Sequence, residues 1–514
     1  MGVSIHLKLS ESITQKEWTA VYERSHIIAE KSGFYDYGKK EVHGENVPCI
    51  FPSEEICCCN ETGWRVVGSL PSYKGAEDFF MPKTFGTAER ISVPYDILYT
   101  LVPHKDGDEP KYNYIWGGKT QGEEYHMGLL AIGCVAEQML GIQALVGGDI
   151  TYRQCVTAAE TASQMLGETI QLPVRCRMQD FYHRIQKFDT LSEAEKLEVF
   201  MEYYLGDDND ELGNFLSESY SSDTLTAYWQ EQFKDRQIGS YGFIRQMQRY
   251  LLLSPNLAGF CSLADFDRTN EKQCEEFVRA VMKSSLHLKE KDCYDPLDLK
   301  HYSVPYGVGN LLASIFMRSA VNPAIDRYIP LDEIRAVLAE QLDRVVDVNT
   351  IIDDYLSEQE NSTKKSGHMQ LMDEAAEYKK EEIENRSRYD ICDREKLSEY
   401  TEKSMLHPKL ADSVCEAFQF YYDLRKEPKC RELLQQSADE MFHYLAVHME
   451  YICLTKRHWE KIYDDLHRDK TVFERYYPMI RLNINGEVAY LVRALVENDA
   501  LWEYCIENYE GEIE

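Results

Sequence analysis

The chain has 514 residues, of which 44% are hydrophobic and 28% are charged, so the composition predicts several folded domains and excludes a largely disordered protein. Its formal charge of −32, from 88 acidic and 56 basic side chains, disfavours nucleic-acid phosphates and anionic lipids as partners and would attract a basic protein. An acidic surface that only keeps the protein soluble would give the same composition.

The N-terminal sequence and the cysteines are typical of a cytoplasmic protein. The first residues, MGVSIHLKLS, lack the basic segment and long apolar stretch of a signal peptide, and no run approaches the roughly 18 apolar residues of a membrane span. Fifteen cysteines are scattered without regular spacing, as expected for free thiols in a reducing compartment. We therefore expect a cytoplasmic, bacterial-type protein.

Residues 1–177 predict an α/β domain. Residues 142–166 predict a strand, a turn and a helix. Thr151 and Gln154 form a capping box at the start of that helix. Alternation of apolar residues predicts strands, and a period near 3.6 predicts helices. The expected strands are 3–9, 64–70, 90–102, 112–118 and 142–150, and the expected helices are 10–31, 127–140 and 151–166.

Long helical patterns follow from Pro173 to the end of the chain. We expect a helical domain over 178–356, a linker or exposed loop over 357–368 and a C-terminal helical domain over 369–514. The expected helices of the middle part are 191–205, 240–253, 276–288, 307–321 and 331–356, with an acidic break at 206–213. The predicted architecture is thus an N-terminal α/β or α+β domain followed by a larger all-α region.

Three adjacent cysteines, Cys57, Cys58 and Cys59, raise the question of a metal site. Zinc ligands usually occur as C-x₂₋₄-C pairs, whereas only one residue separates Cys57 from Cys59 and the next cysteine downstream is Cys134. In a strand, the middle thiol would face away from the other two. We expect ordinary free thiols, with a metal site or redox chemistry as the alternatives.

Other motifs give little support for a cofactor. Gly118-Lys119-Thr120 resembles the end of a phosphate loop, but position 113 is asparagine where that loop needs glycine. Glu440 and His443 form an E-x-x-H pair, but no second such motif accompanies it. Nucleophile-elbow, zinc-helix and dinucleotide-binding motifs are absent from the sequence. We therefore expect no cofactor and no metal.

Two turns of the α/β domain, 116–126 and 147–151, contain the candidate site residues. Asp149 follows a Gly-Gly pair at the end of a predicted strand, where α/β sheets collect ligands. Trp116, Glu123, Glu124 and His126 surround the other turn, and carboxylates with a histidine could act as acid and base. The competing interpretation, which we favour, is that the acidic residues only stabilise helix starts.

The sequence therefore favours a protein that binds another protein without catalysis. One specific form is an acidic, immunity-type neutraliser of a basic toxin or effector, with the acidic runs at 207–211 and 381–384 as contributors. The alternative is a hydrolase-like enzyme with its site at the two turns. Nothing in the sequence identifies the partner, the substrate or the oligomeric state.

Overall fold

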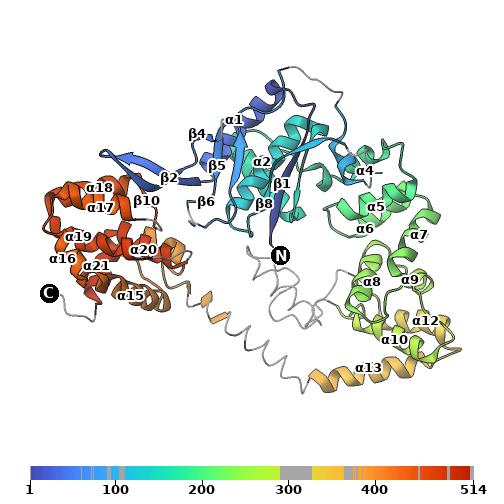
Figure 1. Cartoon of the computed structure of the whole chain (residues 1–514). Coiled ribbons are helices and arrows are strands. Elements are labelled where there is room, and N and C mark those ends of the chain that lie inside the picture. The colour runs from blue at the N-terminus through green and yellow to red at the C-terminus, as the bar shows by residue number, and fades with distance from the viewer. Residues whose placement is uncertain are drawn as a thin grey trace.

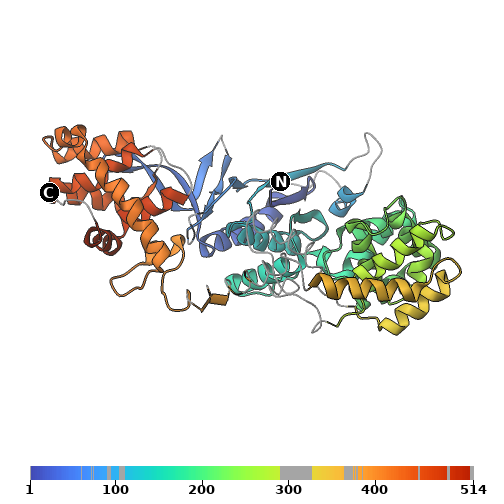
Figure 2. The same ribbon diagram turned by 90° about the horizontal axis from the view of Figure 1, so that it is seen from below.

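The computed structural model shows an N-terminal region of strands and helices followed by a larger helical region, as the sequence predicts. It describes residues 2–58, 61–70, 72, 74–88, 94–102, 110–289, 327–363, 374, 377, 380–381, 383–384, 386–449, 452–482 and 487–509. The N-terminal region (blue to cyan) lies between the middle helices (green to yellow) and the C-terminal helices (orange to red) in both views (Figures 1 and 2).

A three-stranded antiparallel sheet of order β8-β1-β9 forms the centre of the N-terminal region. Its strands are β1 (Ser4–Ser10), β8 (Tyr112–Lys119) and β9 (Ala144–Gly148), and the helices on one side are α1 (Gln15–Lys31), α2 (Tyr125–Leu140) and α3 (Tyr152–Leu166). Ile5, Leu7 and Leu9 of β1 are fully buried in the core with these helices. Alternate residues point to opposite faces, so His6 and Lys8 lie on the other face, which we call the polar face.

Two smaller sheets complete the N-terminal region and connect it to the C-terminal helices. One has the order β4-β5-β7 and the other β10-β3-β2-β6. Their strands are β2 (Phe34–Val42), β3 (Glu45–Pro52), β4 (Glu55–Cys58), β5 (Glu61–Val66), β6 (Gly68–Ser69), β7 (Phe79–Pro82) and β10 (Leu454–Thr455). The long β2–β3 ribbon reaches the C-terminal helices (Figure 1), where Trp459 Nε1 donates to Pro48 O at 2.9 Å.

The middle helices share one hydrophobic core. They are α4 (Met178–Gln186), α5 (Glu193–Tyr203), α6 (Asp210–Ser219), α7 (Ser222–Phe233), α8 (Tyr241–Leu253), α9 (Leu257–Leu263), α10 (Glu271–Lys283), α12 (Leu331–Leu342) and α13 (Val348–Thr363). The short helices before them are η1 (Ile97–Leu101), η2 (Gly141–Gln143) and η3 (Val174–Cys176). Leu145 of β9 and Ile97 of η1 belong to this core, so it joins the N-terminal sheet directly.

The C-terminal helices form a separate core that also includes Val42, Val47 and Cys49 of the ribbon. The longer elements are α15 (Pro408–Asp423), α16 (Pro428–Leu433), α17 (Ala438–His448), α18 (Lys456–Arg468), α20 (Glu487–Glu497) and α21 (Asp499–Glu507). Short elements between them are η5 (Arg394–Glu399), η6 (Leu424–Lys426), η7 (Lys470–Val472), α19 (Phe473–Tyr476) and η8 (Tyr477–Arg481).

Local signals in the sequence place several elements correctly. The Thr151 hydroxyl accepts from the Gln154 amide and the Gln154 side chain accepts from the Thr151 amide, which confirms the capping box of α3. The predicted strands at 3–9, 112–118 and 142–150 correspond to β1, β8 and β9. Helix α2 is the most apolar element: the segment Tyr125–Gln143 is long and apolar enough to cross a membrane, but 72% of it is buried inside the fold, as in the core helix of a globular protein.

Other predicted elements differ from the structure. Helix α1 begins at Gln15 instead of residue 10, because β1 continues to Ser10. Within the strand predicted over 90–102, the structure has the 3₁₀ helix η1, because the Asp96 carboxylate accepts from the Leu98 amide and caps it. The predicted acidic break at 206–213 ends at Asn209, whose side chain caps α6.

The clearest predicted helix, 331–356, is two helices. α12 ends at Leu342 and α13 begins at Val348, and α13 then continues to Thr363, so the first part of the expected linker is helical. The rest of that expected linker, 364–368, and the helix predicted over 307–321 lie outside the described residues.

Candidate functional site

Trp116 lies on the core side of the N-terminal sheet. It pairs with Leu7 across β8 and β1 and is only 4% exposed. Its indole Nε1 is buried and has no hydrogen-bond partner among the residues the structure describes. Trp116 therefore packs in the core.

Glu123 and Glu124 come just before α2, but they do not cap it with their side chains. Glu124 is exposed, whereas Glu123 is half-buried. Burial raises the pKa of the Glu123 carboxyl; nearby Lys74 opposes this shift, and Glu395 adds to it. Lys74 and Glu395 form an ion pair at 2.5 Å between the N-terminal and C-terminal regions, so Glu123 faces the contact between these regions.

His126 is enclosed at the first turn of α2. Its ring is fully buried, and Nδ1 lies 2.7 Å from the Thr120 hydroxyl oxygen. Burial lowers the pKa of His126 to about 4, although the Asp149 carboxylate acts in the opposite direction. The imidazole is therefore neutral at pH 7 and has no exposed surface from which it could exchange a proton with a substrate.

Asp149 is exposed at the end of β9. Its Oδ2 accepts from the Ser4 amide at 2.7 Å and from the Ser4 hydroxyl at 2.8 Å. The carboxylate therefore closes the end of the β1–β9 pair, whereas Thr151 alone caps α3. Of the predicted residues, Asp149 and His126 come within electrostatic reach of each other, as do the adjacent Glu123 and Glu124.

The polar face of the central sheet contains functional candidates that the sequence reasoning did not single out. His6 is flanked by Gly117 on β8 and by Gly147 on β9, and its ring meets the Tyr114 ring of β8 edge-on at a centroid distance of 5.8 Å. Lys8 pairs with Tyr114, and its Nζ lies 5.7 Å from the centroid of that ring. The alternation of polar residues along 4–8 was the available signal, but such residues usually face solvent.

Two basic side chains are buried at this face. Lys8 is 9% exposed, and Arg175 of η3 is 7% exposed with its Nε lacking a hydrogen-bond partner in the described part of the chain. Burial lowers the pKa of both groups, and the charge of Arg175 lowers that of Lys8 further. Burial, Lys8 and Arg175 together lower the pKa of His6 to about 4. Two basic groups therefore act on His6 at this face, and Asp149 acts on it in the opposite direction.

A shallow hollow of about 460 Å³ opens at the same face. It is lined by Ser4, Ile5, His6, Glu77, Tyr114, Gly117, Gly118 and Lys119. Burial and a hydrogen bond with Tyr112 raise the pKa of the Tyr114 phenol to about 12, so its hydroxyl keeps its proton at neutral pH. The volume lies within the range of roughly 300 to 1,000 Å³ that is typical of small-molecule sites.

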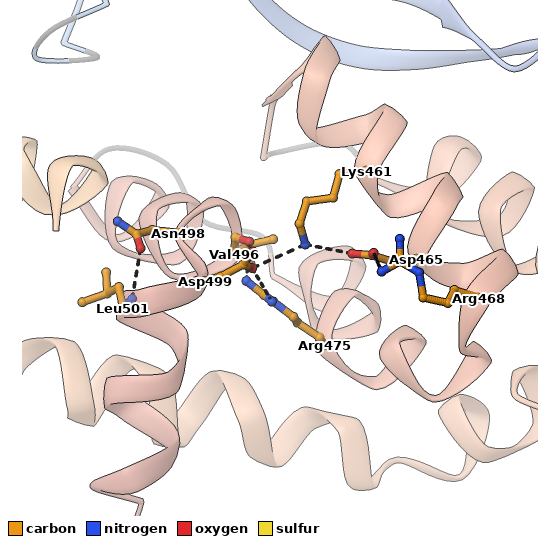
Figure 3. A network of polar contacts seen from close by, with 8 residues as sticks. All are labelled: Lys461, Asp465, Arg468, Arg475, Val496, Asn498, Asp499 and Leu501. Carbon is orange, nitrogen blue, oxygen red and sulfur yellow. Dashed lines mark hydrogen bonds and ion pairs between the residues drawn. The ribbon is translucent and has the colours of Figure 1, made fainter. Parts of the chain in front are cut away.

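A second polar cluster lies among the C-terminal helices (Figure 3). The Asp499 carboxylate contacts Arg475 Nη1 at 2.8 Å and Lys461 Nζ at 3.4 Å, and Lys461 also contacts Asp465 at 2.8 Å. Arg475 Nη2 donates to Val496 O at 2.8 Å. Each basic group here contacts a carboxylate, and the contacts join α18, α19, α20 and α21. We call this cluster the C-terminal brace.

The candidate metal ligands of the sequence are dispersed. Across the described ranges, no group of three or more His, Cys, Asp or Glu side chains is placed to hold a metal ion. His443 Nδ1 lies 2.9 Å from a Glu45 carboxylate oxygen, on the side of the ribbon. Cys57 is an exposed free thiol of β4, and Cys59 lies outside the described residues.

No family model, curated protein or solved structure matches the chain. A function is therefore inferred from the chemistry of the chain's own side chains.

Proposed function

We propose that this chain is a cytoplasmic protein that binds a basic protein partner through its acidic helical surface, without catalysis. An immunity-type neutraliser of a basic toxin or effector is the specific form of this proposal. The excess of acidic residues is concentrated in the helical regions: residues 178–356 carry 31 acidic and 18 basic side chains, and residues 357–514 carry 34 and 22. Residues 1–177 carry only 23 and 16.

The observation that carries the proposal is a cluster of carboxylates around Tyr228, which we call the acidic patch: Glu198, Glu202 and Asp208. Burial raises the pKa of the Tyr228 phenol, Arg249 lowers it, and all three carboxylates raise it, so they act at one place. Glu198 and Glu202 are exposed and stand four residues apart on α5, an arrangement of like charges that destabilises a helix by a few tenths of a kcal/mol. Among the described residues, only Asp208 of the patch has an ion pair, at 3.2 Å from Arg249.

The acidic runs singled out in the sequence contribute unequally. Asp207 and Glu211 are exposed, whereas Asp208 and Asp210 form ion pairs with arginines of the same helical region. The described positions of the run at 381–384 are exposed. Positions without an internal ion pair are the ones that can attract a basic partner, so the patch extends toward Asp207 and Glu211.

The enzymatic alternative has weaker support. It needs an accessible acid or base, but His126 is enclosed and the Asp149 carboxylate is held by Ser4. Glu123 lies at the contact with the C-terminal region, and Glu124 beside it is an exposed carboxylate that is not among the groups acting on His126. The turns at 116–126 and 147–151 thus supply no pair of groups from which we would derive a hydrolytic step.

A capture experiment tests the proposal. The wild-type chain and a Glu198→Gln/Glu202→Gln variant are immobilised and exposed to lysate of the source cell, and bound proteins are identified by mass spectrometry and then purified. We expect one basic protein that binds the wild type in purified form and is retained much less by the variant. A Glu160→Gln/Glu503→Gln variant, which removes the same charge from exposed positions elsewhere, should retain it. An acidic or neutral partner, or equal loss in both variants, would contradict the proposal.

A further inference from the structure

The buried basic groups of the polar face lack the compensation that buried charges normally have. Lys8 contacts the faces of two tyrosine rings, with its Nζ 4.9 Å from the centroid of Tyr112 and 5.7 Å from that of Tyr114. Neither Lys8 nor Arg175 forms an ion pair or a side-chain hydrogen bond with any described residue. A buried charge without a partner is costly and occurs mainly where a ligand or partner supplies the opposite charge.

Among acidic residues, Glu137 raises the pKa of Arg175 most strongly, but both of its carboxylate oxygens already accept backbone hydrogen bonds. Its two carboxylate oxygens accept from the Val146 and Val174 amides, each at 2.8 Å. The carboxylate is therefore oriented by the backbone of β9 and η3, and it acts on the guanidinium only through space. One carboxylate also cannot balance both Arg175 and Lys8.

The basic groups of the C-terminal brace, which are partly buried, provide a comparison. There, Lys461 and Arg475 share the carboxylates of Asp465 and Asp499 at contact distance (Figure 3). The polar face has the same number of basic groups with no carboxylate at contact distance. Lys8 and Arg175 thus lack the direct carboxylate contacts that Lys461 and Arg475 have.

Space for a ligand is available next to these groups. His6, Tyr114 and Glu77 line the hollow of about 460 Å³. Lys8 and Arg175 are not lining residues, but Lys8 Nζ lies 5.7 Å from the Tyr114 ring centroid and the charge of Arg175 lowers the pKa of His6. The His6 ring lies over Gly147, where an added Cβ would come 2.4 Å from its Nε2, and it meets the Tyr114 ring edge-on at a centroid distance of 5.8 Å. His6 and Tyr114 therefore form one wall of the hollow, beside the backbone of Gly117 and Gly118.

We infer that the polar face binds a small molecule through a phosphate or carboxylate group, held by Lys8 and Arg175, with the rest of the molecule in the hollow beside His6 and Tyr114. The Tyr114 hydroxyl and the Lys119 side chain at the rim can contact its polar atoms. The acidic exterior repels anions at long range, so selectivity comes from contacts inside the hollow.

Isothermal titration calorimetry of the full chain tests this inference with two probes, inorganic phosphate and citrate, at constant ionic strength set by sodium chloride. Phosphate and citrate distinguish the two kinds of anionic group. We expect saturable binding of at least one of them, weakened at least tenfold by Lys8→Met and by Arg175→Met. Lys16→Met, which removes the same charge from an exposed position of α1, should change the dissociation constant less than twofold.

Two results would overturn the inference. One is the absence of saturable binding of both anions to the wild-type chain. The other is binding that Lys8→Met leaves unchanged. Circular dichroism verifies that each variant is folded, and if Arg175→Met is not, the Lys8→Met comparison alone decides.

Discussion

The C-terminal brace gives the sharpest prediction for stability. Replacing Asp499 by asparagine removes the charge that Arg475 contacts at 2.8 Å and Lys461 at 3.4 Å, while nearly preserving the shape of the side chain (Figure 3). Arg475 keeps its hydrogen bond to Val496 O and its position 4.6 Å from the Trp502 ring centroid, so the variant should still fold. The change thus measures how much one carboxylate, which contacts two basic groups, contributes to the free energy of unfolding.

The expected cost follows from the exposure of the partners. Opposite unit charges about 4 Å apart attract by roughly 4 kcal/mol at an effective dielectric constant of about 20, whereas fully exposed pairs contribute about 0–1 kcal/mol. The Arg475 side chain is 15% exposed and that of Asp499 is 57% exposed, so the pair lies between these limits. We expect Asp499→Asn to lower the free energy of unfolding of the C-terminal core by about 1–2 kcal/mol.

Hydrogen exchange read by mass spectrometry measures this cost locally, because the three cores need not unfold together. Amides of α18 and α20 should exchange about 5–30 times faster in the variant than in the wild type. Asp464→Asn, on the exposed side of α18, is the matched control and should change exchange little. Equal exchange in the two variants would refute our reading of the brace.

The stability that the Asp499 carboxylate contributes depends on pH in a direction set by its lowered pKa. Burial raises the pKa of Asp499, but Arg475 and Lys461 lower it by more, so the pKa lies below its usual value near 3.8. A carboxyl whose pKa is lowered by folding stabilises the protein fully above its unfolded pKa, and this contribution is lost as the pH falls through the folded value. The difference between wild type and Asp499→Asn should therefore shrink below about pH 4.

Three further predictions concern the N-terminal region. Thr151→Ala removes the cap of α3 and should cost about 1 kcal/mol, seen as faster amide exchange in its first turn. Gly147→Ala forces a Cβ into the neighbouring imidazole and should lower the melting temperature, whereas Gly117→Ala, whose Cβ would meet only ordinary contacts, should change it little. Elemental analysis should find well under one zinc per chain, and stoichiometric zinc lost in Cys57→Ser/Cys59→Ser would contradict this expectation.

Local signals explain which parts of the fold could be predicted. The capping box at Thr151 acts over four residues, so the sequence alone specifies it. The break between α12 and α13 also has a local signal that we missed: Asp347 accepts from the Thr350 amide at 3.1 Å, as in a helix N-cap. The helical spacing of apolar residues continues through the break, because Val346 before the turn and Val348 after it are both buried.

Tertiary contacts explain why the basic site could not be read from the sequence. Lys8 alternates with apolar residues, and a polar residue in such a strand normally faces water. It is buried here because Arg175, far along the chain, and the core around Leu145 lie against the same face. Similarly, Asp96 forms an ion pair with Arg184 of α4 and caps η1, where the apolar pattern predicted a strand.

The association rate of the captured partner tests the proposed function most directly. It is measured by stopped flow at about 50 and 500 mM salt for the wild type and for Glu198→Gln/Glu202→Gln. We predict that salt lowers the wild-type rate strongly, that the variant associates more slowly at low salt, and that dissociation changes less in both cases, because steering by charge acts on the encounter. A wild-type association rate that does not fall with salt would contradict the role that we assign to the acidic patch.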